Sequence, residues 1–324
     1  MTSSDVARHA GVSRATVSHV LNGQGDRFPE ETRRKVLAAA AALEYLPSPA
    51  GRALANGRGD TVVFLLPDTT FRSGLQDAVD LVAEATAPLG ANVVVRFAGR
   101  APATTTSLMR LRPLAVLDFS VLSTEDRMRL EAAGALVLPR NLASDAYQEW
   151  RSFDDTVAEL QVGALTVRGP REMYYATLRD DRSVPYGLPR ADSFTVACEK
   201  RGLGRPGSVA IPLELAGAVE ALGAIKGRAP LAVACYNDYV ALAVMAAVRE
   251  LGLSVPGDIV VVGVDDVEVG QLWSPRLTTV RIDLRQVIGR IVAELREALG
   301  ASAVDEPGFS PDEDWAALVP GETT

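Results

Sequence analysis

Histidines and cysteines, the side chains most often used for acid–base and nucleophilic catalysis, are scarce in this chain of 324 residues. Only His9 and His19 occur, both near the N-terminus, so a Ser-His-Asp or Cys-His centre cannot form in the long remainder of the chain. Cys198 and Cys235 have no Cys-x-x-Cys or Cys/His spacing, so we expect two buried, reduced thiols instead of a disulfide or a zinc site. GxxxxGK[ST] and a GxGxxG after a strand are also missing, which leaves phosphate-loop and dinucleotide chemistry without support.

Three pairs of adjacent carboxylates remain as candidates for chemistry, namely Asp154-Asp155, Asp180-Asp181 and Asp265-Asp266. A glycosidase needs two carboxylates that face each other across a sugar. Adjacent aspartates are more often loop and helix-cap residues. We therefore expect a protein that is not an enzyme and that uses neither a cofactor nor a metal.

Polar side chains instead follow the ends of predicted buried strands. Asp68 follows the strand 61–66, the pair Asn237-Asp238 follows Cys235-Tyr236, and Asp265 follows Val264. Ligands of open α/β sheets bind beyond the carboxyl ends of the strands. Carboxylates accept hydrogen bonds from neighbouring hydroxyls, and a guanidinium supplies fixed donors. These side chains favour a site for a small polar molecule such as a sugar.

The elements that must position these residues begin at Thr61, where apolar strands start to alternate with amphipathic helices. A first series has strands at 61–66, 92–97, 114–118 and 136–138 and helices at 74–89, 104–111 and 124–133. A second series begins near Thr156, with strands at 173–176, 209–211, 231–235 and 259–262 and helices at 191–201, 215–225 and 239–251. A strand at 277–280 and a helix at 284–299 follow, and the tail 301–324 is expected to be only partly structured. The order predicts a two-lobed α/β body with parallel sheets and helices on both faces.

The N-terminal residues predict a separate helical unit. Ser13 is a strong N-cap for a short helix whose apolar positions, Val17, Val20 and Leu21, recur at helical spacing. Thr2 and Asp5 have the spacing of a capping box for an earlier helix, and Gly11 supplies the turn between the two. A third helix is expected from about Glu30 to Leu43. The pattern favours a helix-turn-helix, with a plain αα-hairpin as the alternative.

The other face of the second helix has a surface suited to DNA. It presents Arg14, Ala15, Ser18 and His19, basic and small polar side chains that can lie against base edges in a major groove. Charge agrees with this interpretation, because residues 1–58 hold eight Lys/Arg and five Asp/Glu, a net charge of +3, whereas the whole chain has −8. A basic head binds phosphates, and an acidic body discourages nonspecific DNA binding elsewhere.

The run Asp5-Val-Ala-x-x-Ala-Gly-Val-Ser-x-x-Thr-Val-Ser-x-Val-Leu-Asn22 resembles, almost letter for letter, the opening of the LacI/GalR family of bacterial transcription regulators. Tyr45-Leu-Pro-Ser-Pro-Ala-Gly-Arg-Ala-Leu54 resembles the family hinge, in which the leucine wedges into the minor groove; a plain flexible linker is the alternative for the free protein. The DNA-binding residues implied by this resemblance are Ser13, Arg14, Ala15, Thr16, Ser18, His19, Asn22, Arg52 and Leu54.

The resemblance also implies an effector site. Its arginine motif is matched by Arg190-Ala-Asp-Ser-Phe194 and its Asn-Asp pair by Asn237-Asp238. The implied effector-binding residues are Asp68, Phe71, Arg190, Asp238 and Asp265. A surface salt bridge for Arg190 and a helix N-cap for Asp238 are the alternatives.

The sequence departs from the family pattern at several positions. Pro67–Gly74 replaces an Asn-Pro-aromatic turn, and Arg168-Gly-Pro-Arg171 lacks the usual histidine. Ser193 and Glu44 stand where the family has glycine, and Gly51 replaces a helix-favouring alanine.

We therefore expect a helix-turn-helix domain at 1–46, a hinge segment at 47–59 and an effector-binding and dimerisation body at 60–324. Within the body, the first lobe is expected at about 60–155 and 281–303 and the second at about 156–280 and 304–324. With no signal-peptide core and no apolar run of ~20 residues, the cytoplasm is the expected compartment.

The function expected is that of a sequence-specific transcription repressor that binds a pseudo-palindromic double-stranded operator and is controlled by a small molecule, a sugar or sugar derivative. A homodimer is expected and a tetramer is left open. The alternatives are an activator and a family member that is controlled by a protein partner or by no effector.

Overall fold

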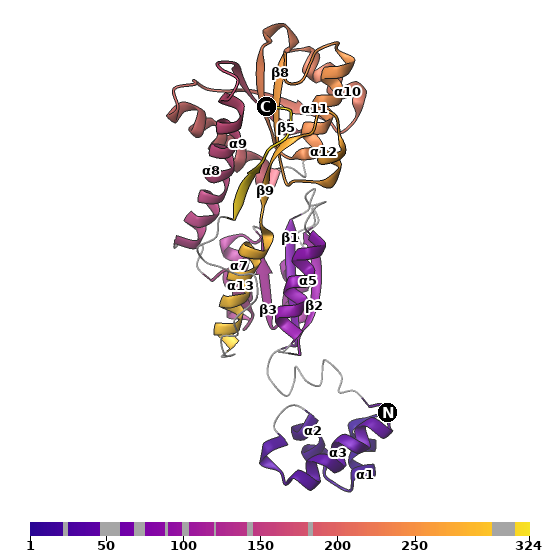
Figure 1. The fold of residues 1–324 in the computed structure, drawn as a ribbon. Helices are drawn as coiled ribbons and strands as arrows, with labels where there is room; N and C mark the ends of the chain where they lie inside the picture. The colour runs from indigo at the N-terminus through magenta and orange to yellow at the C-terminus, as the bar shows by residue number, and fades with distance from the viewer. Residues whose placement is uncertain are drawn as a thin grey trace. The chain divides into compact units, whose positions relative to one another are not determined.

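The computed structural model describes residues 1–21, 25–45, 59–67, 75–87, 90–98, 104–119, 121–140, 145–180, 184–299 and 315–324. Contacts between residues divide the chain into two compact units, residues 1–65 with 83–137 and residues 66–82 with 138–324. The elements are labelled in Figure 1.

The N-terminal head consists of α1 (Ser3–Ala10), α2 (Arg14–Leu21), a 3₁₀ turn (Gly25–Arg27) and α3 (Glu30–Ala42). The predicted capping box is confirmed, because the Thr2 hydroxyl accepts from the Asp5 N–H at 3.4 Å and the Asp5 carboxylate accepts from the Thr2 N–H at 2.9 Å. Gly11 ends α1 with a φ of 66°, a left-handed conformation that glycine adopts without a steric cost. The three helices bury a small core whose largest members are Val6, Val17, Val20 and Val36.

A four-stranded sheet has the order β2-β1-β3-β4, with β1 and β3 parallel. Its strands are β1 (Thr61–Pro67), β2 (Asn92–Ala98), β3 (Ala115–Asp118) and β4 (Leu136–Leu138), and the helices of this part of the sequence are α5 (Leu75–Thr86), α6 (Thr104–Leu111) and α7 (Thr124–Ala132). Val63, Leu65, Leu108, Val116 and Leu130 are among the residues that fill its core.

A six-stranded sheet has the order β10-β9-β8-β7-β5-β6, parallel except for the edge strand β10. Its strands are β5 (Glu172–Leu178), β6 (Gly207–Ile211), β7 (Leu231–Cys235), β8 (Ile259–Val264), β9 (Thr278–Ile282) and β10 (Ala316–Val319). The helices of this part of the sequence are α8 (Asp145–Thr166), α9 (Val184–Lys200), α10 (Leu215–Gly223), α11 (Asp238–Glu250), α12 (Glu268–Leu272) and α13 (Leu284–Leu299).

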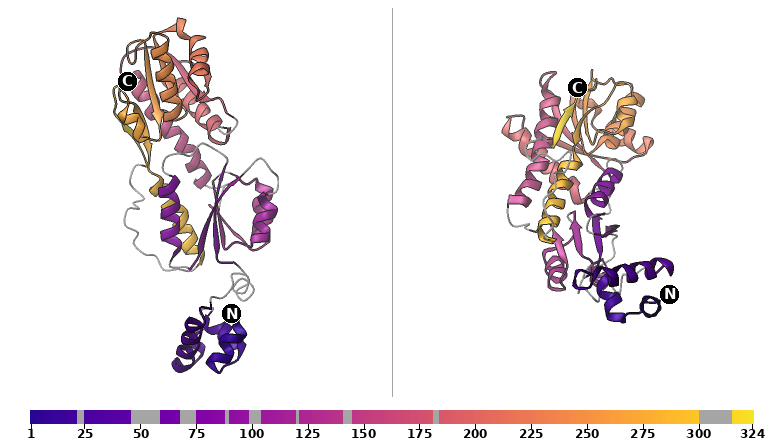
Figure 2. Two further views of the ribbon diagram at one scale, coloured as in Figure 1. Left: turned by 90° about the vertical axis from the view of Figure 1, so that its right-hand side faces the viewer. Right: turned by 60° about the horizontal axis from the view of Figure 1, so that its bottom comes forward.

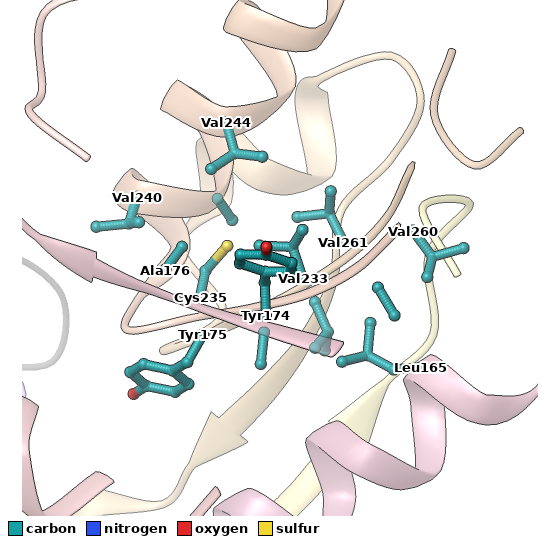
Figure 3. Close-up of a cluster of buried hydrophobic side chains, with 14 of the residues drawn as sticks. Leu165, Tyr174, Tyr175, Ala176, Val233, Cys235, Val240, Val244, Val260 and Val261 are labelled. Atoms are coloured by element: carbon teal, nitrogen blue, oxygen red, sulfur yellow. The ribbon is translucent and has the colours of Figure 1, made fainter. Parts of the chain in front are cut away.

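Helices cover both faces of this second sheet. α8 packs with α9 on one face, and α10 packs with α11 on the other (Figures 1 and 2). Because both faces are covered, β7 and β8 are buried at every position. The side chains of Tyr174 and Tyr175 leave β5 on opposite sides, and Tyr174 lies among the valines of the central core (Figure 3).

Several elements differ from the sequence prediction. α9 begins at Val184 instead of 191 and contains Pro189, although proline removes a backbone donor from a helix. α8 begins at Asp145, ahead of the predicted start of the second series near Thr156. The tail contains β10, which pairs antiparallel with β9 although its four residues are too few for a sequence signal.

The buried ion pair at the end of β3 generates a first prediction. Asp118 and Arg127 side chains are 1% and 7% exposed and lie 3.0 Å apart, and Asp118 also accepts from the Val121 and Leu122 N–H groups. Asp118→Asn should lower the free energy of unfolding by about 3 kcal/mol, because Arg127 would keep a buried charge without its partner.

The matched control is Glu125→Gln, which removes an exposed ion pair with Arg129 on the same helix and should cost about 0–1 kcal/mol. Chemical denaturation of both variants measures the difference. Equal losses for the two variants would mean that the buried pair has no special role.

Candidate functional site

The second helix of the head exposes the face predicted from sequence. Val17 and Val20 are buried against α1 and α3, whereas Arg14, Ala15, Ser18 and His19 are exposed. The N-cap prediction is confirmed, because the Ser13 hydroxyl accepts from the Thr16 N–H at 3.0 Å. α2 therefore presents a continuous basic and polar surface on a helix whose other side is fixed by the core.

Two contacts hold the ends of this surface in place. The Nε of Arg14 donates to the hydroxyl of Ser3 in α1 at 3.0 Å. The ring of His19 lies 6.1 Å from the ring of Phe28, between centroids. Asn22, Arg52 and Leu54, the other DNA-binding candidates named from sequence, lie outside the described residues.

A buried arginine lies at the carboxyl edge of the second sheet. The Arg190 side chain comes from α9, is 14% exposed, and donates from Nη1 to the carbonyl of Tyr236 at 3.1 Å. Its Nε lies 3.4 Å from Oδ1 of Asp154 in α8, and its Cζ lies 5.4 Å from the centre of the Tyr236 ring. The alternative of a surface salt bridge is therefore wrong, because the pair is removed from water.

Charges close to Arg190 explain how the guanidinium is kept in this place. Burial lowers the pKa of Arg190, but Asp265, then Tyr236 and Asp154, raise it, and the net result is a pKa above the ordinary value. Burial raises the pKa of Asp154 and of Asp265 to about 6 each, although Arg190 opposes both shifts. At neutral pH the cluster thus holds one cation and two ionised carboxylates.

The structure brings together Arg190 and Asp265, which were both predicted from sequence as effector-binding residues. It adds Asp154 to this cluster. The sequence analysis noted Asp154 only as one of an adjacent acidic pair. Its position in α8 places it far from Arg190 in sequence, and only the packing of α8 on α9 reveals the contact. Asp68 and Phe71 lie outside the described residues.

Asp238, expected as an effector contact or a helix N-cap, makes its hydrogen bonds inside the second lobe. Its side chain is fully buried, with Oδ2 accepting from the Val267 N–H at 2.8 Å and Oδ1 accepting from the Thr279 hydroxyl at 2.6 Å. The N-cap alternative is wrong, because Asn237 caps α11 by accepting from the Val240 N–H at 3.0 Å. Both of its oxygens therefore accept hydrogen bonds inside the lobe, and the effector contact expected for Asp238 stays a prediction.

Asp238 instead fixes the turn that carries Asp265. Asp265 and Asp266 have φ angles of 103° and 52°, positive values that residues other than glycine rarely adopt. The Val267 N–H bond to Asp238 holds the turn on one side. On the other side, the Asp265 N–H donates to the Val280 carbonyl at 2.9 Å, and Arg281 donates to the Asp266 carboxylate at 2.8 Å.

Comparisons with known proteins agree with this geometry. Residues 2–48 match the family described as bacterial regulatory proteins, lacI family, and residues 162–324 match the periplasmic binding protein-like domain. The transcriptional regulator GalR of Escherichia coli is 30% identical over 325 residues, covering 86% of this chain and 84% of that protein. The chain belongs to the LacI/GalR family of bacterial transcription regulators. The regulator reg1 of Streptomyces lividans is 31% identical, covering 94% of this chain and 92% of that protein.

Solved structures of the family share the fold. The Lac repressor dimer bound to operator and the anti-inducer ONPF superposes with a TM-score of 0.74 at 24% identity, covering 100% of this chain and 98% of that one. The complex of the regulator CelR with cellobiose gives a TM-score of 0.60 at 22% identity. The predicted helical head with a two-lobed body is confirmed, and the chain is a DNA-binding transcription regulator whose relatives are regulators and not enzymes. Within the described residues, no helix is long and apolar enough to span a membrane.

The buried carboxyl group of Asp238 generates a second prediction. Burial raises its pKa from 3.8 to about 8, so the folded protein loses stability as the pH rises through this window and the group must ionise inside the core. Asp238→Asn should remove that part of the loss, because an amide can accept from Val267 and donate to Thr279 without a charge.

The free energy of unfolding, measured between pH 5 and pH 8, tests this prediction. The stability of the variant relative to the parent should increase as the pH rises. Asp258→Asn is the control without pH dependence in this window, because hydrogen bonds from Ser254 lower the pKa of Asp258 and the group is ionised in the folded and unfolded states throughout pH 5 to pH 8. A stability difference between Asp238→Asn and the parent that stays constant with pH would contradict the account.

Proposed function

We propose that the protein is a repressor that binds a pseudo-palindromic operator as a cytoplasmic homodimer, with one α2 in the major groove of each half-site. The observation that carries this proposal is the exposed face of α2, with Arg14, Ala15, Ser18 and His19 on a helix fixed by a buried valine core. The proposed domains are those of the sequence analysis, with a DNA-binding head at 1–46, a hinge at 47–59 and a body at 60–324. An activator that binds the same DNA remains the second candidate.

Each residue of the head has a proposed task. Arg14 forms two hydrogen bonds to O6 and N7 of a guanine, and Ala15 and His19 contact neighbouring base pairs. Ser13, Thr16, Ser18 and Asn22 bind phosphates or bases around this contact. Arg52 and Leu54 of the hinge enter the minor groove, with Leu54 as the wedge.

Arg14→Ala should weaken operator binding by about 1–3 kcal/mol and relax the base preference at one position of each half-site. Selection of binding sites from a random DNA pool, performed with parent and variant, measures that preference. Ser3→Ala serves as one control, because it removes the partner of the Arg14 Nε while leaving the guanidinium for DNA. Lys35→Ala is a second control that removes a positive charge from α3. An unchanged base preference in Arg14→Ala would refute the assignment.

We further propose that a carbohydrate bound at the Arg190 cluster controls DNA binding. Asp154 and Asp265 have pKa values of about 6, so at pH 7 both are ionised and can each accept hydrogen bonds from sugar hydroxyls. Arg190 supplies donors to hydroxyl or ring oxygens. Asp68 and Phe71 remain proposed contacts from the first lobe. The rival is a family member without an effector.

An effector changes operator affinity only to the extent that it prefers one arrangement of the body over another. Coupling of this kind amounts typically to about 1–3 kcal/mol. The residues that bind the effector must therefore be coupled, through contacts in the body, to the DNA-binding head. The Asp265 turn is bonded to β9, which leads directly into α13, so a ligand held at this turn would act on that strand and helix.

Asp265→Asn should abolish the ligand response and leave operator affinity without ligand nearly unchanged. Asparagine tolerates the same left-handed backbone but loses the charge that receives sugar hydroxyls. Fluorescence anisotropy of a labelled operator, with and without D-glucose, D-galactose or cellobiose, measures the response. Asp192→Asn, an exposed aspartate on α9 close to Arg190, is the matched control and should respond as the parent does. An unaltered response in Asp265→Asn would place the effector elsewhere.

A further inference from the structure

Tyr175 carries a buried hydroxyl without a partner. The residue lies in β5, is 2% exposed, and its hydroxyl has no hydrogen-bond partner among the described residues. The ring packs against Phe194 of α9, with 5.4 Å between centroids. The side chain leaves β5 on the side opposite to Tyr174 (Figure 3). This is the face covered by α8 and α9, the two helices that supply Asp154 and Arg190.

A phenylalanine would fill the same volume without the desolvated hydroxyl. Buried polar groups in native proteins are nearly always hydrogen-bonded, and each exception calls for an explanation such as a missing ligand. Packing alone therefore gives no reason for a tyrosine at this position. A ligand that completes its hydrogen bond would give the hydroxyl a reason to be there.

The surroundings of Tyr175 are those of the Arg190 cluster. Tyr175 pairs in register with Ala234 of β7, directly before Cys235 and Tyr236, and the Tyr236 carbonyl receives the Arg190 guanidinium. Arg190 and Asp154 are the two charged side chains close enough to act electrostatically on the Tyr175 hydroxyl. The Nε of Arg190 is also buried and has no hydrogen-bond partner in the described part of the chain. The Tyr175 hydroxyl and the Arg190 Nε thus both lack a hydrogen bond, although the Nε lies in an ion pair 3.4 Å from Oδ1 of Asp154.

We propose that the Tyr175 hydroxyl is a ligand-binding and specificity-determining group, and that the ligand presents uncharged oxygen atoms to it and to the Arg190 Nε. This inference rests on the proposed effector function of the cluster. Asp154 pairs with Arg190 at 3.4 Å and Asp265 acts on the same guanidinium electrostatically, so two acidic groups accompany one cation in this cluster. A sugar phosphate or a sugar acid would be repelled. The ligand class is therefore a neutral polyhydroxylated molecule, which donates to the aspartates and accepts from Tyr175 and Arg190.

Tyr175→Phe tests this inference with two readouts. Without ligand, the midpoint of thermal unfolding should stay equal or rise, because the variant loses only an unsatisfied hydroxyl. With D-glucose, D-galactose or cellobiose, the sugars that stabilise the parent should bind the variant about ten-fold more weakly. Glucose 6-phosphate and glucuronic acid should shift neither protein.

Tyr174→Phe is the matched control, since it makes the same change one residue earlier on the opposite side of β5 and should leave sugar binding unaltered. If ligand-free Tyr175→Phe had a lower midpoint of thermal unfolding than the parent, the hydroxyl would have a structural role, and the inference would be overturned. Equal sugar binding by Tyr175→Phe and the parent would overturn it while leaving the proposed effector function intact. A parent protein stabilised only by the charged compounds, or by none of the panel, would overturn both the ligand class and the effector proposal.

Discussion

The interaction on which the second lobe depends is the burial of the Arg190 guanidinium between elements that are distant in sequence. Removing a guanidinium from water is costly unless other charges and carbonyl groups replace the lost hydration. Here Asp154 of α8, the Tyr236 carbonyl after β7 and Asp265 after β8 supply that replacement. The cation therefore fixes two helices and two strand ends in one arrangement. Its Nε lies in an ion pair with Asp154 at 3.4 Å but makes no hydrogen bond.

A second layer of hydrogen bonds holds the carboxylate that Arg190 requires. Asp265 lies on a turn with two left-handed residues, a conformation that persists only when its surroundings fix it. Asp238 fixes the turn from inside the lobe, through Val267 and Thr279, and a side chain at Gly263 would collide with this carboxylate. Because Thr279 lies in β9, the strand that leads into α13, the turn joins the proposed effector site to the last long helix of the chain.

Sequence patterns predicted the elements well where the signal was local. Ser13, Thr2 and Gly11 specify their caps and turn through short-range hydrogen bonds. Glu44, which stands where the family has glycine, does adopt a left-handed φ of 47° after α3. The site was harder to predict, because Asp154 meets Arg190 only after α8 and α9 have packed together. The hydrogen bonds of Asp238 could not be predicted for the same reason, since its partners Val267 and Thr279 are 29 and 41 residues away.

The most direct test of the account is a crystal structure of the full chain with a neutral sugar that changes its operator affinity. The account predicts sugar oxygens at hydrogen-bond distance, about 3 Å, from the Arg190 Nε and from the Asp154 and Asp265 carboxylates. It also predicts that the buried bonds of Asp238 remain as they are. A sugar bound elsewhere, with the Arg190 Nε still unsatisfied, would contradict the central claim that this cluster recognises the effector.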